Sequence, residues 1–293
     1  MKSESCFERF RVLRKFMAFG AAVICFLLTT LPLYPFYLYR KKLIRPILSR
    51  LVTFYCRLAC WIFDLDVTGG GQGNSEFSSG SGNLIVANHL SYLDIFCLAS
   101  QGPMCFVTSV EIKETLFLGQ LCQLGGCLFV ERRSRSNLKN EIGEIEEALE
   151  NGENVCIFPE GTSTNGDSVS RFKRPLFQAA IRTKARVFPV TLNYLSLGGS
   201  RLNQSNRNNV FWYGEMTFVS HLLNVFRFHY IHVYTTWHSP LSAFNKEADE
   251  LSLAAHEKVA SSFVALVEKR ESETEALEKK RKEAFPLQNF SGL

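Results

Sequence analysis

The sequence predicts an α/β fold, in which a mostly parallel sheet is flanked by helices and is preceded by a pair of apolar N-terminal helices. Two observations carry this prediction. From residue 84 onward, short and almost continuously apolar segments alternate with segments of helical periodicity, which is typical of parallel strands buried on both faces. Before them, residues 16–39 contain no charged side chain, and this run is long enough to cross a hydrocarbon core of about 30 Å.

Basic residues bracket the uncharged run, with Lys15 before it and residues 40–42 after it. A cleaved signal peptide is the main alternative, but the apolar stretch is long for one and no small-residue cleavage site follows it. Pro32 and Pro35 are expected to break or kink a helix in the second half of the run. Two arrangements stay open: a tilted single span, or a re-entrant hairpin with both ends on the cytosolic side.

Residues 46–64 form a segment of a different kind. They are rich in Leu, Phe and Trp, yet Arg50 and Arg57 lie seven residues apart and therefore on one helical face. This pattern predicts a helix that lies in the membrane interface with its arginines toward the headgroups. The alternative is a core helix of a soluble domain.

The remaining elements follow in regular order. A Gly/Ser-rich segment at residues 68–82 is expected to be an exposed and mobile loop. Strands are expected at residues 84–87, 104–108, 127–130, 155–158, 187–192, 209–213 and 230–236. Helices are expected at residues 92–100, 113–124, 137–150, 175–184 and 246 to about 280. Asn151-Gly152 would end the third of these helices, and Pro175 would begin the fourth.

Composition narrows the class of partner. A hydrophobic content of 46% with 25 Phe is high for a soluble protein, and a net charge of +5 is too small to indicate nucleic-acid binding. This balance suits an anionic membrane surface or anionic substrates. The nine cysteines lack disulfide-framework spacing, which favours a reduced, cytosol-facing compartment. No closely spaced ligands accompany any histidine, so no metal site is expected.

Three loops that follow predicted strands carry unusual chemistry, and loops of this kind are where sites gather in parallel sheets. The first contains His89, followed by Ser91 and Asp94 in the capping-box spacing. Because the cap turns the first helical residues back toward the incoming chain, we expect the Asp94 carboxylate to lie beside His89. Such a pair fixes the tautomer of the imidazole and leaves its other nitrogen as a base. A simple helix cap with a surface histidine is the alternative.

The second loop places Arg132, Arg133 and Arg135 just beyond a strand. Guanidinium groups bind phosphate or carboxylate in bidentate fashion, so this cluster suits an anionic group. A solvated run of charges before an exposed helix is the alternative.

The third loop, residues 158–167, begins Phe-Pro-Glu-Gly-Thr. Gly161 and Gly166 have the spacing of a P-loop, but Asp167 replaces the lysine and would repel a triphosphate. A Pro-Glu-Gly turn can instead present backbone N–H groups and a carboxylate to a polar substrate head. No G-x-S-x-G elbow occurs, which argues against an ordinary serine hydrolase.

Together these residues resemble the glycerolipid acyltransferase family, which includes 1-acylglycerol-3-phosphate acyltransferases. The resemblance covers residues 84–192 and rests on four blocks in order: N-H-x-x-x-x-D at 88–94, G-x-x-F-x-x-R at 126–132, F-P-E-G-T at 158–162, and an apolar block with Pro189. It implies that His89, held by Asp94, deprotonates an acceptor hydroxyl. The oxygen would then attack the thioester of acyl-CoA or acyl carrier protein, without a covalent acyl-enzyme.

The resemblance also implies that Arg132, Glu160, Gly161 and Thr162 help to bind the acceptor, and that the N-terminal helical pair docks on the membrane. The chain would then divide into membrane anchor and interfacial helices (1–66), acyltransferase catalytic domain (67–245), and C-terminal amphipathic helix with charged tail (246–293). The expected location is the inner or cell membrane, with the catalytic domain on the cytoplasmic side. Membrane lipids and the thioester co-substrate are the expected partners, with no other bound cofactor and no nucleic acid.

One position departs from the family pattern. Many relatives that act on lysophosphatidic acid have Arg after F-P-E-G-T, where this chain has Ser163; Lys173, with Arg171 and Arg174, could compensate. The segments 158–177 and 212–218 resemble the bacterial branch that includes lyso-ornithine-lipid acyltransferases. The expected activity is acyl transfer to 1-acylglycerol-3-phosphate, giving phosphatidic acid, with lyso-ornithine lipid or another lysophospholipid as the alternative acceptor. A lipid hydrolase and a non-catalytic lipid-binding protein are the remaining alternatives.

Overall fold

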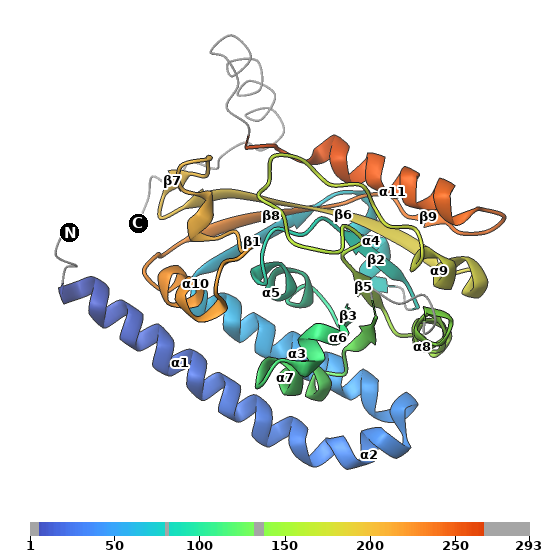
Figure 1. The fold of residues 1–293 in the computed structure, drawn as a ribbon, viewed down its shortest axis with the longest axis horizontal. Coiled ribbons are helices and arrows are strands. Elements are labelled where there is room, and N and C mark those ends of the chain that lie inside the picture. The colour runs from blue at the N-terminus through green and yellow to red at the C-terminus, as the bar shows by residue number, and fades with distance from the viewer. Residues whose placement is uncertain (1–5, 80–81, 132–137, 267–293) are drawn as a thin grey trace, which may run out of the picture.

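The computed structural model describes residues 6–79, 82–131 and 138–266, and within them the chain forms a nine-stranded sheet (Figure 1). The hydrogen-bonded order is β1-β8-β6-β2-β5-β3-β4, and β7 and β9 pair with β6. The strands are β1 (Leu65–Gly70), β2 (Leu84–Ala87), β3 (Cys105–Ser109), β4 (Leu128–Val130), β5 (Val155–Ile157), β6 (Arg186–Leu197), β7 (Ser200–Arg201), β8 (Ile231–Trp237) and β9 (Leu241–Ser242).

The sheet is parallel where the site-bearing loops leave it. β6, β2, β5, β3 and β4 all run in one direction, whereas β8 runs antiparallel to β6 and carries β1 with it. In the register of the central strands, Val86 pairs with Ile157 and Ala87 pairs with Val190. The carboxyl ends of β2 and β5 therefore lie side by side, and so do the loops that follow them.

Helices cover both faces of the sheet, as the sequence predicts. They are α1 (Cys6–Thr30), α2 (Tyr34–Tyr39), α3 (Lys41–Phe63), α4 (Gln72–Ser79), α5 (Leu93–Ala99), α6 (Val110–Glu114), α7 (Leu118–Leu124), α8 (Leu138–Glu150), α9 (Phe177–Thr183), α10 (Phe218–Val225) and α11 (Ala248–Ser262), with 3-10 turns η1 (Leu31–Leu33) and η2 (Arg207–Asn209). Alternate residues of β2 enter different cores: Ile85 and Ala87 pack on the α3 and α5 side, whereas Leu84 and Val86 pack on the α8, α9 and α11 side. This alternation is the two-residue period of a strand buried on both faces.

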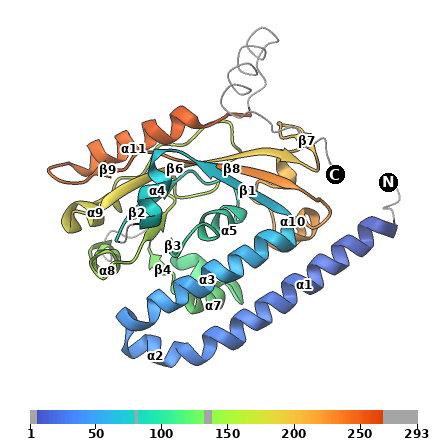
Figure 2. The same ribbon diagram turned by 180° about the vertical axis from the view of Figure 1, so that it is seen from behind.

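The N-terminal helices form a hairpin. α1 ends at Thr30, where the predicted break occurs, because Pro32 and Pro35 begin the short turns η1 and α2. The chain then returns along α3, and Figure 2 shows α1 and α3 side by side. Two helical stretches, Phe7–Tyr39 and Lys41–Phe63, are long and apolar enough to cross a membrane; the first is almost wholly exposed and the second is about half buried.

Helix α3 has features of both alternatives, an interfacial helix and a core helix. It begins at Lys41, five residues earlier than predicted, and contains Pro46 in its interior. One face packs against α5 and the sheet, as a core helix would. Its opposite face is exposed and carries Arg50 and Arg57 together with Phe54 and Trp61. The division of the chain after residues 66 and 245 stays a prediction.

Lys15 fastens α1 to the rest of the protein. Its ammonium group is almost fully buried and donates to the backbone oxygens of Phe63 (3.2 Å) and Phe228 (2.7 Å). The Asp64 carboxylate lies 2.9 Å away and completes the set. A buried cation needs such partners, because without them its desolvation would cost several kcal/mol.

Several predicted elements are wrong. Residues 72–79 of the expected loop form helix α4, which Phe77 holds by stacking on Trp237 with ring centroids 4.3 Å apart. Residues 209–213 form no strand; η2 ends at Asn209, and Val210 and Phe211 enter the core beyond it. The helix expected at 113–124 is interrupted between α6 and α7. The predicted C-terminal helix ends at Ser262, and its expected extension beyond residue 266 lies outside the described residues.

Candidate active site

His89 and Asp94 meet at the carboxyl end of β2. Asp94 lies in the first turn of α5, and its Oδ2 accepts the backbone N–H groups of Leu90 (2.7 Å) and Ser91 (2.9 Å). The same oxygen lies 2.9 Å from Nδ1 of His89. The carboxylate therefore closes the turn and holds the imidazole at once, so the predicted contact across the start of the helix is present. The Ser91 half of the capping box is absent, since α5 begins after Tyr92 without a side-chain cap and the Ser91 hydroxyl has no partner.

The contact with Asp94 sets the tautomer of the His89 imidazole. A carboxylate only accepts hydrogen bonds, so Nδ1 of His89 carries the proton that faces Asp94, and Nε2 is left with its lone pair. The ring stacks on Phe158, with centroids 4.1 Å apart and planes 14° from parallel. The His89 side chain is 18% exposed and that of Asp94 is fully buried. The imidazole is therefore the part of the pair that solvent or a substrate can contact.

Two residues outside the predicted set hold this arrangement. The hydroxyl of Tyr194 donates to Oδ1 of Asp94 at 2.7 Å, and burial raises the pKa of Tyr194, which keeps the hydroxyl protonated. The side chain of Asn88 pairs with the backbone of Leu192 in both directions, at 2.8 and 3.0 Å. This clamp ties the end of β2 to β6 just before His89. The adjacency of Asn88 to His89 was a signal for it, whereas nothing in the sequence links Tyr194 to Asp94.

Glu160 is oriented toward the chain that carries His89. Its Oε1 accepts the backbone N–H of His89 at 2.7 Å, and its Oε2 accepts that of Ser170 at 2.8 Å. Burial raises the pKa of Glu160, and these two hydrogen bonds oppose the shift. Both oxygens therefore have partners within the protein, and the carboxylate positions His89 in addition to any role in binding an acceptor, which stays a prediction.

The other predicted binding residues lie around the same turn. Gly161 has φ +83°, a left-handed conformation that favours glycine. The Lys173 side chain lies over it so closely that a Cβ at position 161 would collide with the ammonium end. The backbone N–H of Lys173 also donates to Pro159 at 2.8 Å. Thr162 is exposed beside them, so the structure brings Glu160, Gly161 and Lys173 together, with Thr162 at the surface.

Ser163 has a structural partner in place of the family's arginine. Its hydroxyl donates to the backbone oxygen of Trp212. The backbone N–H of Trp212 donates to Leu90 at 3.0 Å, and that of Thr164 donates to His89 at 2.9 Å. The F-P-E-G-T loop, the His89 loop and the segment at Trp212 are therefore tied into one unit. The predicted acceptor-binding residue Arg132, with Arg133 and Arg135, lies outside the described residues.

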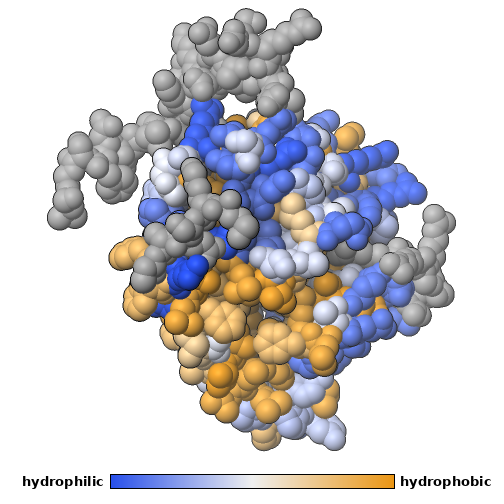
Figure 3. All heavy atoms as spheres, turned by 60° about the vertical axis from the view of Figure 1, so that its left-hand side comes forward, coloured by the Kyte–Doolittle hydropathy of each residue, from blue (hydrophilic) through white to orange (hydrophobic). Residues whose placement is uncertain are grey.

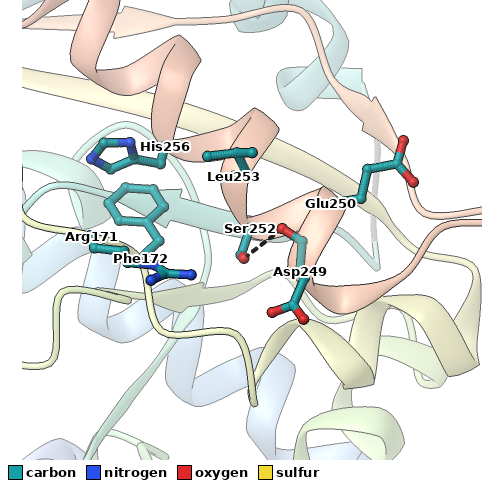
Figure 4. Close-up of a pocket in the computed structure, with 7 residues that line it drawn as sticks. All are labelled: Arg171, Phe172, Asp249, Glu250, Ser252, Leu253 and His256. Carbon is teal, nitrogen blue, oxygen red and sulfur yellow. Dashed lines mark hydrogen bonds between the residues drawn. The ribbon is translucent and has the colours of Figure 1, made fainter.

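A pocket of about 220 Å³ lies elsewhere (Figure 4). It is lined by Arg171, Phe172, Asp249, Glu250, Ser252, Leu253 and His256, from the start of α11 and the segment facing it. Phe172 belongs to the core on the α11 side of the sheet, whereas Phe158, which stacks on His89, packs against the other core. The pocket is therefore separate from the His89–Asp94 pair. In the part of the chain that the structure describes, no three His, Cys, Asp or Glu side chains are grouped to hold a metal ion.

Comparison with known proteins shows what the segment that carries this site is similar to. The family model Acyltransferase matches residues 71–193, which include His89, Asp94 and the F-P-E-G-T loop. This segment of the chain is therefore similar to the acyltransferase family. The crystal structure of the 1-acyl-sn-glycerophosphate (LPA) acyltransferase PlsC from Thermotoga maritima shares the fold, with a TM-score of 0.56 and 19% identity over 86% of this chain and 96% of that one.

Relatives at higher identity carry two kinds of name. The 1-acyl-sn-glycerol-3-phosphate acyltransferase of Neisseria gonorrhoeae is 38% identical over 121 residues, 41% of this chain and 48% of the relative. The lyso-ornithine lipid O-acyltransferase of Rhizobium meliloti is 31% identical over 178 residues, 58% of this chain and 60% of the relative. That of Brucella abortus is 29% identical over 232 residues, 77% of this chain and 85% of the relative. The chain thus spans about half the length of the Neisseria relative and more of the lyso-ornithine lipid enzymes.

Proposed function

We propose that this chain transfers a fatty acyl group from an acyl thioester to the free hydroxyl of a lysolipid, with His89 as the general base. The observation that carries the proposal is the 2.9 Å contact between Nδ1 of His89 and the buried Asp94 carboxylate, which leaves Nε2 as the proton acceptor. The acyltransferase-family match over residues 71–193 and the names of the relatives support it.

The proposed reaction uses this geometry. Nε2 of His89 takes the hydroxyl proton as the lysolipid oxygen attacks the thioester carbonyl, and the negative charge of Asp94 stabilises the imidazolium that forms. The tetrahedral intermediate then expels the thiolate, which receives the proton from Nε2. General-base catalysis of this kind contributes about 100- to 10,000-fold to the rate. Acyl-CoA and acyl carrier protein are the two donors proposed, and no acyl-enzyme is required.

The proposed acceptor depends on two predicted binding residues. Lys173 over Gly161, with the predicted Arg132, would bind the phosphate of 1-acylglycerol-3-phosphate, and phosphatidic acid would be the product. At the position where many relatives that act on lysophosphatidic acid have a second arginine, this chain has Ser163, whose hydroxyl donates to Trp212. This difference favours lyso-ornithine lipid as the alternative acceptor. The coverage of the Brucella abortus relative supports the same alternative.

The proposed location is the membrane, with the site on the cytoplasmic side. The two apolar helical stretches support membrane association. Free thiols are found at Cys25, Cys56, Cys60, Cys97, Cys105, Cys122, Cys127 and Cys156, which supports a reducing compartment.

The experiment that tests the proposal uses the full chain in lipid vesicles. Labelled acyl-CoA and acyl carrier protein thioesters are supplied separately, each with lysophosphatidic acid or lyso-ornithine lipid, and products are separated by chromatography. We expect a two-chain lipid with at least one pair, and its loss in His89→Gln but not in the matched control His256→Gln. Release of free fatty acid without acylated lysolipid would identify a hydrolase instead, and lipid binding without turnover would identify a non-catalytic protein.

A further inference from the structure

The turn between α6 and α7 displays two large apolar side chains to solvent. Leu116 is 87% exposed and Phe117 is 54% exposed. Phe117 also has φ +71° and ψ −52°, a strained conformation for a residue with a Cβ. The backbone N–H of Gly119 donates to Thr115 at 2.9 Å and closes the turn. A strained and closed turn that holds its largest apolar groups in water indicates a surface with a partner.

Helix α10 presents a second apolar protrusion. Its inner face is buried through Leu222 and Val225, as expected for a surface helix. Its outer face carries Val219, which is 64% exposed, and Leu223, which is 38% exposed. These two residues are four apart and therefore adjacent on the helix surface. The helix is thus apolar on both faces.

These two protrusions flank His89. On one side the ring of His89 stacks on Phe158, and Phe158 stacks in turn on Phe106 of β3, the strand that leads into α6. On the other side, Tyr92, which follows the His89 loop, contacts Phe218 at the start of α10, with centroids 5.0 Å apart. The α6–α7 turn and α10 are therefore each joined to the His89 loop through a short series of aromatic contacts.

The N-terminal helix joins the two protrusions into one surface. Phe19 of α1 packs on Phe226 at the end of α10, with centroids 6.0 Å apart, and α1 also contacts α7. The outward apolar residues of α1 recur at helical spacing, and Leu31 of η1 follows them: Phe7, Phe10, Leu13, Met17, Ile24 and Leu28. Figure 3 shows hydrophobic residues gathered over the lower half of the molecule, where α1, α2, α3 and α7 lie in Figure 1, and hydrophilic residues over the upper half.

We propose that the α6–α7 turn and α10 bind the lipid bilayer directly and, with α1, form a single bilayer-contacting surface around the approach to His89. The occupant is lipid because the surface is continuous with a helix whose length and composition match a hydrocarbon core. The acceptor then moves laterally from the membrane to His89. The lipid substrate rests on the proposed function, whereas contact of the turn with the bilayer does not.

The test measures depth in vesicles that contain no lysolipid and no thioester, so it is independent of turnover. Leu116→Trp and Val219→Trp are compared with Leu253→Trp, an exposed leucine on α11, after subtraction of the signal from the native tryptophans. We expect lipids brominated along the acyl chain to quench the new tryptophans at 116 and 219, and not the one at 253. Equal quenching at all three positions, or none at any, would overturn the proposal.

A second measurement separates a bilayer from a second copy of the chain. Leu116→Glu should raise the KM for lysolipid in vesicles by about tenfold, with kcat for a short-chain, water-soluble lysolipid unchanged. Leu253→Glu should change neither quantity. If the chain instead self-associates in detergent and Leu116→Glu abolishes this association without changing the KM in vesicles, the surface is a dimer interface and the proposal is wrong.

Discussion

Tyr194 donates a 2.7 Å hydrogen bond to Asp94 across a separation of 100 residues in the sequence. With this bond, the fully buried carboxylate has four donors: the Tyr194 hydroxyl, the His89 ring, and the N–H groups of Leu90 and Ser91. A buried charge of this kind is stabilised by its hydrogen bonds, which also restrict its orientation. Tyr194, near the end of β6, therefore orients the Asp94 carboxylate, which in turn orients the imidazole of His89.

Tyr194→Phe is expected to lower kcat by about tenfold with little change in KM, because Asp94 loses a donor while the substrate-facing residues are untouched. Steady-state kinetics with vesicle-borne lysolipid measure the two quantities separately. Tyr230→Phe is the matched control, since its hydroxyl also donates to an aspartate, Asp66, away from His89. An unchanged kcat in Tyr194→Phe would remove Tyr194 from the positioning of the pair.

Asp94→Asn is expected to reduce kcat by about 100-fold or more, with a small change in the thermal midpoint. The amide oxygen still accepts the N–H groups of Leu90 and Ser91, so the turn is kept. The negative charge that stabilises the imidazolium of His89 is lost. Parallel activity and thermal denaturation measurements separate the two effects, and unfolding at the growth temperature would show instead that Asp94 acts mainly through the fold.

Glu160→Gln is expected to destabilise the protein by about 1–3 kcal/mol, because one of the two N–H groups that the carboxylate accepts, that of His89 or of Ser170, then faces an amide NH₂. The thermal midpoint should fall by a few degrees and activity should fall with it. Glu257→Gln, at an exposed position of α11, serves as the control and should change neither. A stable Glu160→Gln protein with raised KM alone would favour a role confined to acceptor binding.

We expect His238 to make the stability of the protein depend on pH. The Thr191 hydroxyl donates to Val259, so its oxygen accepts from Nε2–H of His238 at 2.9 Å. Burial lowers the pKa of His238 to about 4, below the value of about 6.5 for an exposed histidine. Between these values the unfolded chain binds more protons than the folded one. The contribution of His238 to the free energy of unfolding is therefore fully present above pH 6.5 and is lost as the pH falls toward 4.

Denaturant unfolding at pH 7.5 and pH 5 measures this effect. The wild type should lose more free energy of unfolding between the two pH values than His238→Gln, which keeps a donor for Thr191 and does not titrate. The exposed His229 gives the control variant, His229→Gln, which should lose as much as the wild type. Equal losses in His238→Gln and the wild type would show that His238 is not the titrating group.

Local patterns predicted the parallel strands and the contact between His89 and Asp94, because both depend on residues close in sequence. The interruption at residues 115–117 was missed, since an apolar run reads as one helix and a strained turn leaves no compositional signal. Helix α4 was missed because its Gly/Ser-rich sequence holds one large apolar residue, Phe77, whose partner Trp237 is distant in the chain. Tyr194 was missed for the same reason, as its partner is set by the pairing of β6 beside β2.

The position of Lys15 has a consequence for biosynthesis. The groups that receive its ammonium come from Phe63, Asp64 and Phe228, the last of which lies 213 residues further along the chain. At about 5–20 residues per second, the ribosome needs roughly 10–40 s to make that separation. During this interval the cation of the new apolar helix lacks the last of its acceptors, and anionic headgroups at the membrane surface supply a counter-charge until Asp64 is made. This helix is therefore made well before the segment that completes its attachment.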